Sequence, residues 1–238
     1  MKIISFVGKA GSGKGYQMMK HLEDVKSNGY PVMCMSLADP LKELFRKNFG
    51  MYRDGSIDED VYKYLETAHD VNIGKGILDY TAGIYNRTYG YDYTILNEKI
   101  QEASKHVPKV IEAIKNKDIR KCLQLYGTEV AHTFSNSIWV DFLLKKLFKL
   151  LDLNFIDSEL HVYIDDMRFA TEYDTISNFA NVYGYKFECY GVECSDEVRC
   201  ERRNMTMDEL KVLDSHKSEQ EVGIIIDKLE KEYIINNN

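Results

Sequence analysis

The chain has 238 residues, which is enough for one sizeable α/β domain but cramped for two full domains. Apolar residues make up 44% and charged residues 29%, and this balance excludes a wholly disordered or collagen-like chain. The formal net charge of −7 argues against a protein that coats nucleic acid or an anionic membrane through its overall field.

The predicted elements alternate between strands and helices along the chain. Short apolar runs predict strands, the first two of them buried, at 3–7, 30–37, 161–164, 186–192 and 233–235. Apolar residues at helical spacing predict helices at 16–28, 41–49, 96–115, 119–133, 139–153, 172–183 and 196–213. Residues 51–93 are rich in Asp, Gly and Tyr and read as loop with short helices. Strands separated by helices imply an α/β fold with a parallel sheet and right-handed crossovers.

The five cysteines form no CxxC pair and no zinc-type spacing, so we expect reduced, mostly buried thiols. The opening apolar stretch is too short for a signal peptide, and no run approaches the roughly 18 apolar residues of a membrane span. We therefore expect a cytoplasmic protein, with no membrane and no nucleic-acid polymer among its partners. The helix at 139–153 is either core or a homodimer face, and core is the preferred interpretation.

Residues 8–15 read GKAGSGKG, which matches the phosphate-loop pattern GxxxxGK between a predicted strand and a predicted helix. Glycines let the backbone turn its N–H groups inward, where they and the positive end of the helix cradle phosphate. Lys14 would then reach the β and γ phosphates of ATP. The predicted ATP-binding residues are Gly8, Gly11, Ser12, Gly13, Lys14, Gly15 and Tyr16. The alternative is a glycine-rich turn that contains a lysine by chance.

Gly15 stands where a Ser or Thr usually ligates Mg²⁺, so the metal would rely on water, nucleotide oxygens and a carboxylate elsewhere. Asp165 and Asp166 follow the strand at 161–164, and Arg168 comes two residues later. These positions face the carboxyl edge of a parallel sheet, where ligands bind. A phosphate loop needs a carboxylate at such a strand end to organise Mg²⁺ through water, and Asp165 and Asp166 are the candidates. The alternative is a polar strand end with a surface arginine.

Arg199, Arg202 and Arg203 share a predicted helix and could close over ATP as a lid that neutralises charge during transfer. A solvated charged face is the alternative interpretation. With Lys14, Arg168 and Asp166, these three arginines are the predicted catalytic residues.

Four segments, in this order, resemble the bacteriophage-type deoxynucleoside monophosphate kinases, phosphate-loop enzymes related to adenylate kinases. They are GKAGSGKG at 8–15, SLADPLKELF at 36–45, IRKCLQLYGTE at 119–129 with Trp139-Val140 beyond it, and DDMR at 165–168. A weaker fifth match combines DSHKSE at 214–219 with IINNN at 234–238. Residues 51–95 match nothing in the family pattern.

The resemblance implies a three-layer P-loop fold in a single kinase domain, residues 1–238. Its core would cover roughly 1–50, 155–195 and 220–238, with a helical substrate-binding insertion at 51–153 and a lid at 195–219. The implied reaction transfers the γ-phosphoryl of ATP, with Mg²⁺, to a (deoxy)nucleoside 5′-monophosphate. The implied acceptor-binding residues are Lys42, Arg120, Gln124, Thr128 and Arg168. The resemblance also implies that Asp166 helps to position Mg²⁺ through water.

Three features depart from the family pattern: Gly15, His132 in place of a second arginine, and an end at Asn238 where the pattern continues into a helix. Three alternatives stay open. An animal-type phosphomevalonate kinase shares the phosphate loop, the Pro-Leu-Lys segment, the Asp-x-Arg and the Ser-Glu element, and a dephospho-coenzyme A kinase is more distant. Gly15 and His132 suggest the third, a nucleotide-binding scaffold without catalysis. Base preference does not follow from the sequence. Five tyrosines of the unmatched stretch either pack or stack on a base: Tyr52, Tyr62, Tyr85, Tyr89 and Tyr91.

Overall fold

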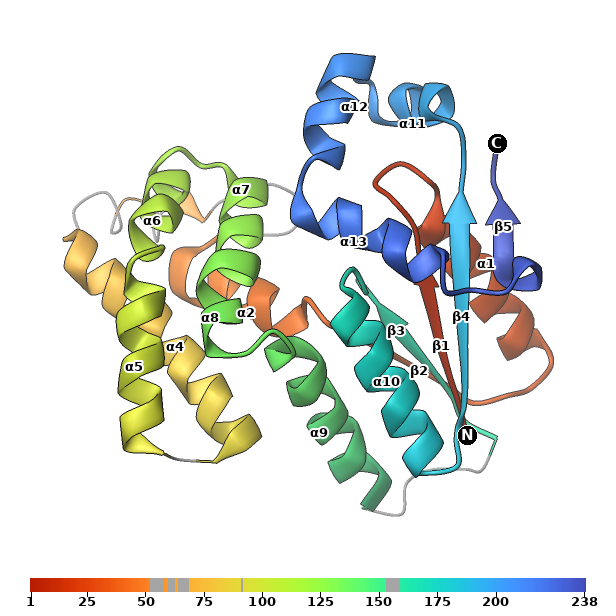
Figure 1. Ribbon diagram of the computed structural model, residues 1–238, viewed down its shortest axis with the longest axis horizontal. Coiled ribbons are helices and arrows are strands. Elements are labelled where there is room, and N and C mark those ends of the chain that lie inside the picture. The colour runs from red at the N-terminus through yellow and green to blue at the C-terminus, as the bar shows by residue number, and fades with distance from the viewer. Residues whose placement is uncertain (52–57, 60–62, 64–68, 91, 153–158) are drawn as a thin grey trace. The chain divides into compact units, whose positions relative to one another are not determined.

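The computed structural model describes residues 1–51, 58–59, 63, 69–90, 92–152 and 159–238. The chain forms two compact units, one of Met1–Leu37 with Lys146–Asn238 and the other of Ala38–Lys145. The first unit contains the sheet, and the described elements of the second are helical (Figure 1).

The sheet of the first unit has five parallel strands. They are β1 (Lys2–Val7), β2 (Val32–Ser36), β3 (His161–Asp165), β4 (Lys186–Glu193) and β5 (Ile234–Asn236), in the order β2-β3-β1-β4-β5. Every neighbouring pair is parallel. The predicted α/β class and parallel sheet are therefore confirmed.

Helices cover both faces of this sheet. α1 (Lys14–Ser27) joins β1 to β2, and α10 (Ala170–Val182) joins β3 to β4, toward opposite edges of the sheet. Right-handed crossovers in opposite directions place their helices on opposite faces. In Figure 1, α1 lies behind the sheet, and α10 and α13 (Lys217–Ile226) lie in front. This arrangement is compatible with a three-layer α/β fold and brings the carboxyl ends of β1 and β3 to one edge.

The central strands form the core of the sheet, while β2 lies at its edge. Ile3, Ile4 and Val162 are fully buried, as expected for strands covered on both faces. In β2 only Met35 is buried and Cys34 is exposed. The prediction of a buried strand at 30–37 is wrong for most of its length, because β2 pairs with β3 alone.

All five cysteines are free, as predicted, but their burial differs from the prediction. Cys122 and Cys189 are buried, Cys34 is exposed, and the other two are of intermediate exposure. The edge position of β2 explains the exposed thiol.

The charged segment after β4 contains separate helices. The helix predicted at 196–213 divides into α11 (Asp196–Arg203) and α12 (Met207–Asp214). Asn204, with φ of 51°, ends α11, and the hydroxyl of Thr206 caps α12. The following helix α13 was not predicted, because β-branched residues and Gly223 weaken its local helical signal.

The described helices of the second unit include one that the sequence did not indicate. α4 (Asp70–Tyr89) is a helix of 20 residues within the stretch predicted to be loop with short helices, so that prediction is wrong for this segment. Its buried face includes Ile73, Ile77 and Ile84. A Cβ at Gly74 would lie 3.0 Å from Val107 Cγ1, so this glycine permits close helix packing. Burial thus overrides the low helix propensity of glycine here.

The other helices of this unit lie near the predicted positions. They are α2 (Asp39–Phe49), α5 (Tyr93–Ser104), α6 (Val107–Lys115), α7 (Ile119–Gln124) and α8 (Ala131–Phe134). The helix predicted at 96–115 is divided, because Pro108 lies in the first turn of α6 and favours a new helix start there. Residues Leu125–Val130 form a π-helical turn between α7 and α8.

Helix α9 (Ile138–Asp152) includes residues of both units. Trp139, Leu143, Leu144 and Leu147 are all buried, so the interpretation of this helix as core is confirmed. No helix in the described part of the chain is long and apolar enough to cross a membrane.

Candidate functional site

A glycine-rich loop at residues 8–13 joins β1 to α1 in the first unit. Gly11 and Gly13 both have φ of 87°, a left-handed conformation that other residues adopt only at a cost. At Gly8 a Cβ would lie 2.6 Å from the Val192 carbonyl oxygen and 2.5 Å from Ser12 Oγ. The backbone path therefore requires glycine at these positions of the motif.

The loop leads directly into α1, and no side chain caps the N-terminus of this helix in the described structure. Gly13 is the N-cap residue, and the first N–H groups of a helix have no partner within the helix. The helix dipole adds positive potential at the same end. Gly15 and Tyr16 are both exposed in this first turn. This end of α1 therefore has the properties of an anion-binding site.

Ser12 is a buried residue of the loop, and its main-chain groups hold the loop in place. Its N–H donates to the Lys9 carbonyl at 3.0 Å, and its carbonyl accepts from Asn237 Nδ2 at 2.8 Å and Arg202 Nη1 at 3.2 Å. The side chain is 1% exposed and packs against Gly8. These contacts make Ser12 part of the loop's framework.

Two cationic side chains interact beside this helix end. Burial is the main cause of the lowered pKa of the half-buried Lys14, and the charge of Arg168 lowers it further. The carboxylates of Asp166, Glu219 and Asp165 oppose that shift. Because like charges are held close together here, a bound anion would relieve their repulsion.

Two buried carboxylates hold Arg168 from different sides. Arg168 Nη1 lies 2.5 Å from Glu219 Oε1, and the Arg168 N–H donates to Glu172 Oε2 at 2.7 Å. Glu172 also accepts the Phe169 N–H at 2.9 Å. Burial raises the pKa of Glu172 to about 7, although these N–H contacts and the charge of Arg168 act in the opposite direction.

We expect Glu172→Gln to change the pH dependence of stability. Folding raises the pKa of Glu172 from 4.5 to about 7, so unfolding releases a proton between these values. The contribution of this group to the free energy of unfolding is fully present below pH 4.5 and falls by about 3 kcal/mol as the pH rises to 7. Denaturant unfolding at several pH values should show a shallower decline for the variant. The same dependence of the unfolding free energy on pH in wild type and variant would contradict the argument that burial raises the pKa of Glu172.

Asp166 lies immediately after β3, with φ of 64°. Its Oδ2 accepts a hydrogen bond from Ser36 Oγ, at the end of β2, at 3.0 Å. Among the described residues, no group of three or more His, Cys, Asp or Glu side chains could hold a metal ion. Mg²⁺ commonly uses one or two carboxylates together with water and substrate phosphates, and Asp165 and Asp166 fit that more limited role.

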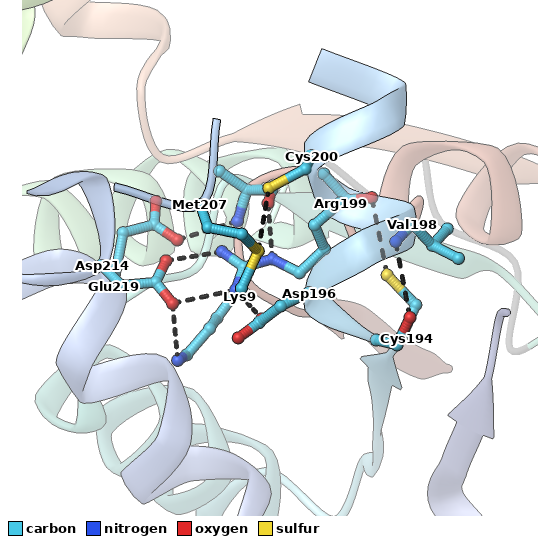
Figure 2. A network of polar contacts seen from close by, with 12 residues as sticks. Lys9, Cys194, Asp196, Val198, Arg199, Cys200, Met207, Asp214 and Glu219 are labelled. Atoms are coloured by element: carbon cyan, nitrogen blue, oxygen red, sulfur yellow. Dashed lines mark hydrogen bonds and ion pairs between the residues drawn. The ribbon is translucent and has the colours of Figure 1, made fainter. Parts of the chain in front are cut away.

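Arg199 differs from the expected lid arginine because it is buried. Its side chain is only 2% exposed, and its Nη2 and Nη1 atoms lie 2.5 and 2.8 Å from the two Asp214 oxygens. Nη1 also donates to Asp196 at 2.9 Å, and Nε donates to the Ala10 carbonyl at 2.9 Å. Figure 2 shows the guanidinium between Asp214 and Asp196. Arg199 therefore supports the glycine-rich loop through its hydrogen bond to the Ala10 carbonyl.

Arg202 and Arg203 are exposed on the same helix. Arg202 Nη2 donates to the Asn237 carbonyl at 2.8 Å, in addition to the contact of Nη1 with Ser12. Asn237 in turn accepts from Gln17 Nε2 at 2.8 Å. Glu219, Asp214 and Asn237 were not predicted to have a role. The signal that could have indicated them is their position in the two weakly matching segments, DSHKSE at 214–219 and IINNN at 234–238.

The predicted acceptor residues other than Arg168 belong to the second unit. Lys42 is of intermediate exposure on α2, and Arg120 is exposed on α7. Gln124 ends α7, and its carbonyl accepts from Thr128 Oγ1 at 2.7 Å within the π-helical turn. π-helical turns often occur at functional sites, although this turn is not by itself evidence for a ligand.

Packing joins the segments at 36–45 and 119–129 inside the second unit. The rings of Phe45 and Tyr126 are 5.8 Å apart in an edge-to-face arrangement, and a Cβ at Gly127 would contact Leu41 at 3.5 Å. The Gly127 carbonyl accepts from Trp139 Nε1 at 3.2 Å. These contacts explain why apolar and aromatic residues recur in both segments.

The structure gives packing contacts for the described tyrosines of the unmatched stretch. Tyr85 and Tyr89 have ring centroids 4.8 Å apart, and Tyr89 donates to Asp141 at 2.5 Å. Tyr52, Tyr62 and Tyr91 lie outside the described residues.

Comparison with known proteins adds no relative to this description. No protein-family model matches the sequence, and no curated protein is significantly similar to it.

Proposed function

We propose that the protein is an ATP-dependent phosphotransferase whose acceptor is a (deoxy)nucleoside 5′-monophosphate. The observation that carries the proposal is the uncapped N-terminus of α1 after the glycine-rich loop, with Lys14 at its first position. Arg168 lies near enough for its charge to lower the pKa of Lys14. Three kinds of positive potential converge there: two side-chain charges, main-chain N–H groups and a helix dipole. A multiply charged phosphate ester is the ligand class that best fits this combination.

The proposed reaction depends on positioning and charge neutralisation. Main-chain N–H groups at the uncapped N-terminus of α1 bind the ATP phosphates, Lys14 neutralises the transferring group, and Arg168 binds the acceptor phosphate. An acceptor phosphate oxygen forms a bond to the γ-phosphorus as the bond to the β-phosphate oxygen breaks, releasing ADP. Mg²⁺, when bound, neutralises phosphate charge, and Asp166 would hold it through water. No obligatory general base is assigned.

The choice of acceptor rests on the ordered sequence segments of the second unit. Lys42, Arg120, Gln124 and Thr128 remain predicted acceptor contacts on that ground. The second candidate function is a nucleotide-binding scaffold without catalysis, which is favoured by the absence of a hydroxyl at Gly15 and by His132.

A coupled assay of ADP release from MgATP tests this proposal. The acceptors are dTMP, dGMP, dCMP, dAMP and phosphomevalonate, with ATP binding measured separately by calorimetry. Turnover with a nucleotide supports the proposal, and turnover with phosphomevalonate alone favours the alternative kinase. ATP binding without turnover on any acceptor would contradict the kinase proposal and support the nucleotide-binding scaffold.

We expect Gly15→Ser to lower the Mg²⁺ concentration needed for half-maximal turnover by about threefold or more, because it restores a hydroxyl at the usual ligand position. The substitution fits, since a Cβ at Gly15 meets nothing within 4 Å. Titration of turnover with Mg²⁺ at fixed ATP measures the effect. Gly15→Ala is the matched control, because it adds the Cβ without the hydroxyl. Equal Mg²⁺ dependence in the two variants would contradict the prediction.

A further inference from the structure

Both main-chain polar groups of Ala10, in the middle of the loop, are held by charged side chains. The Ala10 N–H donates to Glu219 Oε2 at 2.8 Å, and the Ala10 carbonyl accepts from Arg199 Nε at 2.9 Å. Each of these side chains is only 2% exposed. Hydrogen bonds to buried charged groups are stronger than those between neutral groups, so these contacts restrict the loop at one residue from both sides.

The two side chains that hold Ala10, Arg199 and Glu219, have different further partners. Arg199 continues to Asp214, which also lies 2.9 Å from Lys9 Nζ, so Arg199 connects the loop to α12 (Figure 2). Glu219, in the first turn of α13, connects instead to Arg168 through its other oxygen, at 2.5 Å. Of these two residues, Glu219 is therefore the one that contacts both the loop and the proposed acceptor-binding arginine.

We propose that Glu219 is a positioning residue that sets the Arg168 guanidinium relative to the phosphate-binding loop. One carboxylate oxygen fixes the Ala10 N–H, and the other fixes Arg168 Nη1. The spacing of the two oxygens within one rigid carboxylate sets the distance between the loop and the arginine. Glu219 also offsets part of the positive charge that Arg168 and Lys14 place side by side. This role rests on the proposed function, because it concerns the alignment of donor and acceptor phosphates.

A neighbouring residue provides a matched control. Glu221 lies on the same helix and its Oε2 accepts the Ala170 N–H at 3.0 Å, so it too joins α13 to a main-chain group. Its partner lies at the start of α10, outside the loop. Glu221→Gln and Glu219→Gln each remove one negative charge while keeping an amide oxygen as an acceptor.

The test measures four proteins and one double variant: wild type, Glu219→Gln, Glu221→Gln, Arg168→Ala, and Glu219→Gln with Arg168→Ala. For Glu219→Gln we expect kcat/KM for the acceptor to fall about tenfold or more, with the KM for ATP within about threefold of wild type. In the Arg168→Ala background the same substitution should have an effect of about twofold or less, because its partner is gone. Glu221→Gln should match wild type in both constants. Thermal unfolding of each variant accompanies the kinetics.

The result that overturns the positioning role is an equal loss of kcat/KM for Glu219→Gln with and without Arg168, or a loss that Glu221→Gln reproduces. Glu219→Asp gives a second check, since it keeps the charge and shortens the reach by one methylene. Recovery of most activity in Glu219→Asp would contradict a requirement for the fixed spacing. Failure of the proposed function has a different signature: wild type then binds no MgATP in calorimetry or turns over no nucleotide acceptor.

Discussion

Lys14→Ala is expected to lower turnover by about three orders of magnitude while leaving the fold intact. The lysine supplies a positive charge at the first helical position of α1, where the transferring phosphoryl group is proposed to bind. Burial and the charge of Arg168 both lower its pKa, so the folded protein holds this charge at a cost. Removing it should therefore leave the unfolding temperature unchanged or slightly higher.

The measurement combines the coupled assay with thermal unfolding. Lys20→Ala is the control, because Lys20 is exposed on the same helix and outside the loop. Turnover of Lys14→Ala within a factor of a few of wild type would remove the loop from the mechanism. A loss of turnover accompanied by unfolding would instead show that Lys14 is structural.

Arg199→Ala is expected to destabilise the protein by about 3–5 kcal/mol, because it leaves the partly buried Asp214 carboxylate with Lys9 as its remaining cationic partner and leaves the Ala10 carbonyl without its donor. Hydrogen bonds with Asp214 are the main reason that the pKa of Arg199 is raised, and they lower the pKa of Asp214 in turn. Denaturant unfolding at pH 7 measures the change. Arg203→Ala, exposed on the same helix, should stay within about 0.5 kcal/mol of wild type.

The pair of variants also separates the two interpretations of the arginine cluster. A lid arginine that acts only on bound ATP would lower turnover when removed and leave the stability of the ligand-free protein unchanged. Removal of an arginine that supports the loop would lower the stability of the ligand-free protein. The buried geometry of Arg199 leads us to expect the second outcome for this residue.

The sheet and the glycine-rich loop could be predicted from the sequence, because short apolar runs indicate the strands and the spacing of glycines indicates the loop. The apolar run at β1 and the glycines that follow it are adjacent in sequence, so one short segment contains both the strand and the turn. The alternation of strands and helices then predicted the parallel sheet, which the observed strand pairing confirms.

The contacts that support the loop could not be predicted in the same way. Arg199 and Asp214 lie on different helices, and residue spacing on one helix does not show whether a charged face is solvated or paired. α4 was missed for the opposite reason, since its glycines lower local helix propensity while tertiary burial of Ile77 stabilises the helix. In both cases the deciding interaction connects segments that are distant in sequence.

The support of the loop also has a consequence for the order in which the protein becomes functional during synthesis. The side-chain contacts to Ala10 and Ser12 come from Arg199, Arg202, Glu219 and Asn237, at sequence separations of 189, 190, 209 and 225 residues. A growing chain therefore contains the whole phosphate-loop motif long before it contains the groups that hold the motif in shape. Loop closure over such distances is slow compared with local helix formation. The proposed nucleotide affinity should accordingly appear only after residues 196–237 have left the ribosome, so the first segment synthesised is among the last to mature.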